Sequence, residues 1–71
     1  MKLIANDYEP KDIIRIIREW TNLKQSDFGA TINRSKRTVQ DYEAGITNYN
    51  VSMLLDIAKK NDIIITLEKK R

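Results

Sequence analysis

Four long polar side chains share one face of the segment from residue 35 to residue 44 when it is read as a helix. They are Lys36, Arg37, Gln40 and Asp41. Val39 and Tyr42 fall on the opposite face, which can anchor the helix to a core. Arg and Lys donate to guanine, Gln bonds adenine at two points, and Asp accepts from cytosine. The spacing therefore predicts a surface that reads base edges.

The same face has a structural alternative, because polar residues on an outward helix face are usually only solvated. Arg37 and Asp41 can form an i,i+4 pair worth only about 0.2–0.5 kcal/mol. Asp41 itself leaves two functional interpretations open. It either reads a cytosine, or it repels phosphate and restrains affinity.

The element before this helix gives the face its context. A short helix is expected from Gln25 to about Ile32, followed by a tight turn at Asn33 and Arg34. Ser35 suits the N-cap of the next helix, and Gly45 suits its C-terminal stop. Two short helices joined by such a turn have the spacing of a helix-turn-helix, whose second helix lies in the DNA major groove. We place this motif at residues 24–45.

Two amphipathic helices are expected to flank the motif. The first begins near Pro10, and its predicted buried stripe is Ile13, Ile16, Ile17 and Trp20. The second follows a capping Asn50, and its predicted stripe is Val51, Leu54, Leu55 and Ala58.

The C-terminal segment 63–68 is short and β-branched, which predicts a strand. A lone strand leaves its backbone groups unpaired. Antiparallel pairing with a second copy would bury Ile63, Ile65 and Leu67 and make a homodimer. The alternative is pairing within the chain, with residues 2–5.

Composition narrows the function classes. The 71 residues fit one small domain, with a net charge of +3 that suits an anionic partner. There is no Cys and no His, which excludes disulfides, the commonest zinc sites and imidazole bases. We expect no metal, no cofactor and no enzymatic activity. No signal peptide or membrane segment is visible, so we expect a cytoplasmic protein without a membrane partner.

The stretch Lys24–Gly45 resembles the helix-turn-helix signature of the Xre/Cro family, which includes phage lambda-type repressors and many small bacterial regulators. The register matches without a gap, and the resemblance covers about residues 11–60. It implies a mainly α, four- to five-helix lambda-repressor-like domain, to which the sequence adds the C-terminal strand. Gly29 stands where the family usually has Ala, and Arg34 stands where an apolar residue is common.

The resemblance also implies roles for individual residues. The positions that match the family's DNA contacts are Gln25, Ser35, Lys36, Arg37, Thr38, Gln40, Asp41 and Asn48. Arg34 departs from the family pattern, and we add it to the DNA-binding positions because an outward arginine there can contact phosphate. Gln25 matches a residue that touches phosphate and braces the second helix of the motif, and Ser35, Thr38 and Asn48 match positions that meet the DNA backbone. Arg18 and Glu43 match a largely buried ion pair between the first and third helices. The alternative for that pair is two unrelated surface charges.

We therefore expect a sequence-specific regulator of transcription that binds double-stranded DNA. Its family resemblance implies a prokaryotic or phage repressor that binds a pseudo-palindromic operator as a homodimer. The alternative is the antitoxin of a toxin–antitoxin pair, which binds a toxin protein and autoregulates its operon.

Overall fold

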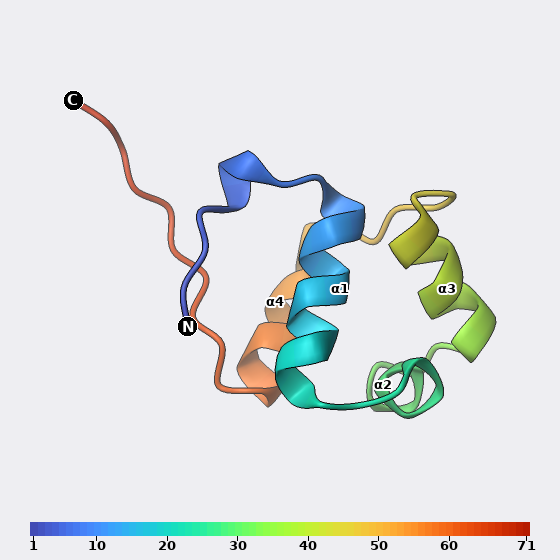
Figure 1. The fold of residues 1–71 in the computed structure, drawn as a ribbon. Coiled ribbons are helices and arrows are strands. Elements are labelled where there is room, and N and C mark those ends of the chain that lie inside the picture. Colours follow the sequence, from blue (N-terminus) through green and yellow to red (C-terminus); the bar gives the residue numbers. More distant parts are fainter.

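The computed structural model describes residues 1–71, and all of its regular secondary structure is helical (Figure 1). A short 3-10 helix, η1 (Ala5–Asp7), precedes four α-helices. These are α1 (Pro10–Thr21), α2 (Gln25–Thr31), α3 (Lys36–Ala44) and α4 (Val51–Lys60). None of them combines the length and the apolar character that crossing a membrane requires. The lambda-repressor-like helical class predicted from the sequence is confirmed.

Local chemistry explains where the helices begin and end. Ser35 and Asn50 cap α3 and α4, because each side-chain oxygen accepts a backbone N–H three residues on, at 3.1 and 2.8 Å. Asn22 and Gly45 end α1 and α3 in the left-handed region, at φ 60° and 77°. Lys24 precedes α2 without a side-chain cap. The caps at Ser35 and Asn50 and the stop at Gly45 agree with those expected from the sequence.

The core gathers one or two residues from every α-helix. Its buried members are Ile14, Ile17, Phe28, Val39, Tyr42 and Ile57. The stripe predicted on α1 is partly confirmed, because Ile17 is buried and Ile13, Ile16 and Trp20 are half-buried, but it omitted the fully buried Ile14. Ile13 and Ile14 are adjacent, and the helical period alone does not decide which of them faces the core. The positions of the neighbouring helices decide it.

The stripe predicted on α4 was also partly wrong. Ile57 and Ala58 are buried, whereas Val51 is 70% exposed and Leu55 is 40% exposed. Apolar residues occupy more than one face of α4. The helix buries one face and leaves the other in solvent. In Figure 1, α1 lies centrally, α2 and α3 lie to one side of it, and α4 lies behind it.

The predicted C-terminal strand at 63–68 is not formed. No residue from 64 to 71 makes a backbone hydrogen bond, and pairing with residues 2–5 is likewise not seen. Ile63 packs against the core, but Ile65 is 39% exposed and Leu67 is fully exposed. The prediction fails in the single chain because a strand needs a neighbouring strand, and this chain supplies none.

Candidate nucleic-acid interface

The third helix has two chemically different sides. Lys36, Arg37 and Gln40 are exposed on its outer side, while Val39 is fully buried and Tyr42 nearly so. Asp41 lies at the edge of the outer side, and its side chain is 24% exposed. The polar groups are thus directed to solvent from a helix whose inner side is fixed in the core.

One ion pair lies on this outer side. The Nε of Arg37 donates to Oδ1 of Asp41 at 3.2 Å. The pair spans one helical turn, and the Arg37 side chain remains 81% exposed. The i,i+4 pairing considered from the sequence is therefore formed, while the guanidinium stays in the solvent.

The hydroxyls at the start of α3 are held by each other. Ser35 Oγ accepts from the backbone N–H of Thr38, and the two hydroxyl oxygens lie 3.1 Å apart. This arrangement fixes the first turn of α3. It also places both hydroxyls at the helix end where the positive backbone dipole favours an anion.

The turn between α2 and α3 is close and well bonded. Asn33 adopts φ 57°, and the backbone N–H of Arg34 donates to the Gly29 carbonyl at 2.8 Å. The exposed Arg34 side chain donates from Nη1 to the Asn33 carbonyl at 3.1 Å. Arg34 thus points outward from the turn, in place of the apolar residue common at this position.

Gly29 allows that close approach. A Cβ on Gly29 would lie 2.4 Å from the Arg34 carbonyl oxygen and 3.2 Å from Cγ2 of Val39. Contacts below 3 Å require the structure to shift. The departure from Ala at Gly29 is therefore explained by the position of the turn.

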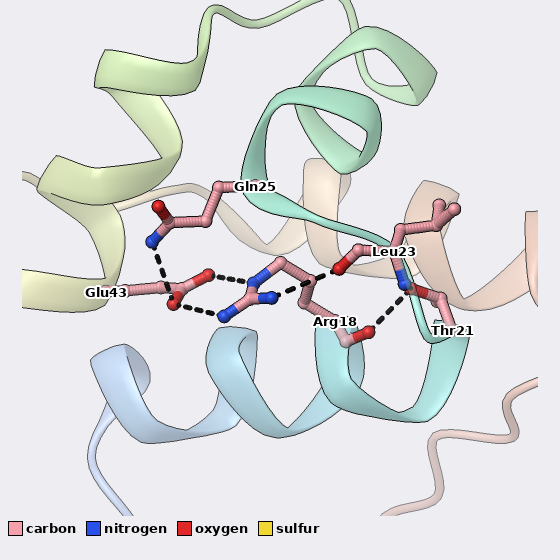
Figure 2. Close-up of polar contacts among 5 residues, drawn as sticks. All are labelled: Arg18, Thr21, Leu23, Gln25 and Glu43. Carbon is pink, nitrogen blue, oxygen red and sulfur yellow. Dashed lines mark hydrogen bonds and ion pairs between the residues drawn. The ribbon is translucent and has the colours of Figure 1, made fainter.

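A polar network connects α1, α2 and α3 near the end of α3 (Figure 2). Arg18 on α1 donates from Nε to Glu43 Oε2 at 2.6 Å and from Nη2 to Oε1 at 3.0 Å. Gln25 at the start of α2 donates to the same Oε1 at 3.3 Å. Glu43 closes the last turn of α3. Each helix of the motif is thereby connected to α1 through one carboxylate.

The network is largely shielded from water. The side chains of Arg18 and Glu43 are 19% and 9% exposed. The hydrogen bond to Glu43 raises the pKa of Arg18 above its ordinary value, so the guanidinium is held in its charged form. Two parallel bonds between guanidinium and carboxylate also fix the geometry of the pair.

The same arginine fixes the connection between α1 and α2. Its Nη1 donates to the Leu23 carbonyl at 3.1 Å. Thr21 Oγ1 donates to the Arg18 carbonyl at 2.6 Å and accepts from the Leu23 N–H at 3.3 Å (Figure 2). Sequence reasoning missed Thr21 and Leu23, because the partner in each case is a backbone group.

The loop that carries Asn48 is anchored by its neighbour. Tyr49 donates its hydroxyl to the Pro10 carbonyl at 2.6 Å and packs edge-on against Tyr42, with ring centroids 5.7 Å apart. Burial raises the pKa of Tyr49. Asn48 is exposed beside this anchor, in a shallow hollow that Lys11 also lines. Tyr49 was not predicted as a positioning residue, since a loop tyrosine gives no signal of its partner.

Comparison of the sequence with known protein families identifies the helical fold and the helix-turn-helix motif in one match. Residues 14–63 match the family model described as Helix-turn-helix, of the Xre/lambda-repressor type. The chain belongs to this helix-turn-helix family. No curated protein and no solved structure matches it. The family consists of DNA-binding regulator domains and is not an enzyme family, so this helix-turn-helix protein is a DNA-binding regulator of transcription.

Proposed function

We propose that this helix-turn-helix protein is a repressor that binds a pseudo-palindromic operator as a homodimer. It would act in the cytoplasm of a prokaryotic cell, where a bound dimer occludes a promoter. The observation that carries the proposal is the two-sided α3, which directs Lys36, Arg37 and Gln40 outward while Val39 is fixed in the core.

The outer side of α3 supplies the specificity in this proposal. Lys36, Arg37 and Gln40 are exposed side chains of the types that hydrogen-bond base edges in the major groove. The Glu43 network supports the proposal, because a reading helix must keep its angle to the body when it enters a groove. A good bidentate contact discriminates between bases by about 1–3 kcal/mol.

The residues around α3 supply the contacts to phosphate. We assign this role to Gln25, Arg34, Ser35, Thr38 and Asn48. Four of them are exposed or partly exposed at the ends of α3 or α2, and Asn48 is exposed in the loop before α4. Such contacts position the helix on the duplex without reading its sequence. They also make the affinity depend steeply on salt.

The surface area of the single chain supports self-association. It exposes 5717 Å². A compact monomer of 8.3 kDa is expected to expose only about 4,600 Å². The excess of roughly 1,100 Å² exceeds the ~800 Å² that each partner buries in a standard interface. Isolated small domains also need additional burial to be stable.

The C-terminal segment is our choice for the dimer contact. Leu67 is fully exposed, Ile64 is 86% exposed, and the backbone groups of 64–71 have no partner in the chain. Pairing of two such segments across a two-fold axis would satisfy the backbone and cover Ile65 and Leu67. Part of Ile63 is already covered by its own core.

Selection of bound sequences from random duplex DNA, at stated salt, tests the function. We expect a symmetric motif with half-sites about one helical turn apart. Binding to the selected duplex should weaken with salt, with a log–log slope near −0.9 for each phosphate neutralised. Arg34→Ala should lower that slope by about one without changing the motif. Failure to enrich any motif would contradict the proposal.

Sedimentation of the purified chain tests the dimer. We expect a reversible monomer–dimer equilibrium. A monomer at all concentrations, together with capture of one stoichiometric heterologous protein from the native host, would contradict the homodimer and favour the antitoxin alternative.

A further inference from the structure

The pair between Arg37 and Asp41 uses only part of the guanidinium. A guanidinium carries one N–H on Nε and two on each terminal nitrogen. Asp41 accepts from Nε, at 3.2 Å. The four N–H groups on Nη1 and Nη2 remain free, at the far end of a side chain that is 81% exposed. The ion pair therefore fixes Nε and leaves Nη1 and Nη2 available to bind a base.

This choice of donor restricts how Arg37 can meet a base. An arginine can present two adjacent donors to O6 and N7 of guanine, either both terminal nitrogens or Nε with one of them. The bond to Asp41 occupies Nε and leaves the end-on arrangement through Nη1 and Nη2. Guanine is the base that offers two acceptors to such a fork in the major groove.

Asp41 is much less exposed than Arg37, as expected if Asp41 holds Arg37 in place. The Asp41 side chain is 24% exposed, whereas that of Arg37 is 81% exposed. The carboxylate thus lies close to the helix while the guanidinium extends outward. Neither Lys36 nor Gln40 has a side-chain hydrogen bond on this face, so Arg37 is the reading side chain with a defined orientation. An orientation set before binding lowers the entropy lost when a long side chain is immobilised.

The charge of Asp41 also favours this arrangement over direct reading. An unpaired carboxylate on a surface that meets DNA would be repelled by the phosphates. Paired with Arg37, its charge is locally compensated by the guanidinium. Direct acceptance from cytosine N4 would require Asp41 to exchange this bond for one at the edge of a base.

We propose that Asp41 is a positioning residue that holds Arg37 for end-on recognition of one guanine in each half-site. The inference rests on the proposed operator binding and adds the base that is read and the residue that enforces it. Asp41 acts through Arg37 and makes no base contact of its own.

The test uses the full chain and the duplex that it selects. Binding is measured by fluorescence anisotropy for wild type, Arg37→Ala, Asp41→Ala and the double variant. Each protein is titrated with the selected duplex and with duplexes that carry the other three base pairs at each half-site position. A further duplex contains 7-deazaguanine in place of the guanine, which removes the N7 acceptor.

We expect wild type to prefer guanine at one position by about 10-fold or more, and Arg37→Ala to lose that preference. Asp41→Ala should lower the preference for guanine about 3- to 10-fold. In the Arg37→Ala background, adding Asp41→Ala should leave the relative affinities for the four base pairs unchanged. The 7-deazaguanine duplex should weaken wild type several-fold and leave Arg37→Ala unchanged.

Charge and folding are controlled separately. Asp41→Asn removes the charge but keeps an acceptor oxygen, so it should retain part of the preference. Asp7→Asn makes the same charge change in η1, away from α3 (Figure 1), and should leave the preference intact. Unfolding curves for each variant verify that α3 remains formed, and Asp41→Asn carries the test if Asp41→Ala does not fold.

Three results would overturn the inference. Absence of any selected motif would remove the proposed function and the inference together. A selected motif in which Asp41→Ala abolishes a cytosine preference, while the Arg37-dependent guanine is kept, would show direct reading and leave the proposed function standing. An equal effect of Asp41→Ala with and without Arg37 would show that the pair is only structural.

Discussion

Two regions of this small protein differ in how completely one chain stabilises them. The α1–α3 region has Ile14, Phe28 and Val39 fully buried, and its three helices meet at Glu43. The region from α4 to the C-terminus buries only Ile57 and Ala58, and it leaves Val51 and Leu67 in solvent. The α1–α3 region, which we propose faces DNA, has its supports within the single chain, including Ile57 of α4 in the shared core. The other region leaves apolar side chains in solvent, which is the surface that we propose a second copy covers.

Under the proposed function, this contrast separates two tasks, reading DNA and forming a dimer. A reading helix has to be rigid before it meets DNA, so its supports are internal. An assembly surface must remain uncovered until its partner arrives, so its supports are external. Substitutions at the buried contacts of the first region should therefore change the free energy of unfolding, and changes in the second should alter association.

The largest effect is expected at the centre of the polar network. Glu43→Ala would strand the largely buried Arg18, and removing one partner of a buried pair costs about 3–5 kcal/mol. A chain of 71 residues has a total stability of only roughly 4–10 kcal/mol. Urea unfolding followed by circular dichroism should therefore show severe destabilisation.

The exposed pair between Arg15 and Asp12 on α1 provides the matched control for Glu43→Ala. It has an N–O distance of 3.6 Å, and its side chains are 49% and 30% exposed, so it is less shielded than the network of Glu43. Asp12→Ala should cost less than about 1 kcal/mol. Equal losses in the two variants would contradict the special role of the network.

The next effect is expected at the α2–α3 turn. Gly29→Ala should destabilise by about 1–3 kcal/mol, because the added Cβ would lie 2.4 Å from the Arg34 carbonyl oxygen. Helix propensity alone predicts a gain of roughly 0.5–1 kcal/mol. Ser26→Ala, at an exposed position of the same helix, should stay within about 0.5 kcal/mol of wild type. A stabilised Gly29→Ala variant would mean that the turn lies farther from α2.

A smaller effect is expected where the loop before α4 meets α1. Tyr49→Phe removes the hydroxyl that donates to Pro10 and should cost about 0.5–1.5 kcal/mol, while the ring packing on Tyr42 is kept. Thermal unfolding at neutral pH would measure this loss.

The pH dependence of Tyr49 follows from the same burial. Its folded-state pKa is raised above the ordinary value of 10.0, so the folded state favours the protonated phenol. This contribution to stability is present below pH 10 and is lost as the pH rises through the raised pKa. Tyr49→Phe should reduce the fall in stability above pH 10. An unchanged alkaline profile would contradict a buried phenol.

The smallest effect on the fold is expected at the C-terminus. Deletion of residues 64–71 should change the monomer's unfolding free energy by less than about 0.5 kcal/mol, because they make no backbone hydrogen bonds. It should, however, abolish the dimer in sedimentation and make unfolding independent of protein concentration. Leu67→Asp should reproduce the loss of the dimer, and Lys70→Asp, near the exposed end, should not. An intact dimer after the deletion would move the contact elsewhere.

The same contrast explains what the sequence could predict. The positions of Ser35, Asn50 and Gly45 gave the helix boundaries, because capping depends on residues a few positions apart. The outer face of α3 followed from helical periodicity. The ion pair of Arg18 with Glu43 joins residues 25 positions apart, and only the family pattern predicted it.

Features that depend on distant neighbours were not predictable from local patterns. The choice of Ile14 over Ile13 depends on where the other helices lie, and so does the exposure of Val51. The strand predicted at 63–68 would need a neighbouring strand, and no other segment of the single chain pairs with it. The bond from Tyr49 to Pro10 joins a side chain to a backbone carbonyl 39 positions away, which no composition signal reveals.

The most direct measurement of the central claim compares wild type with Arg37→Ala on the selected operator and on an unrelated duplex of equal length, at the same salt. The account predicts that the ratio of specific to nonspecific affinity falls by about 10-fold or more, while the unfolding free energy is unchanged. Equal loss of affinity on both duplexes would show that Arg37 contacts only phosphate, and it would contradict a base-reading outer face of α3.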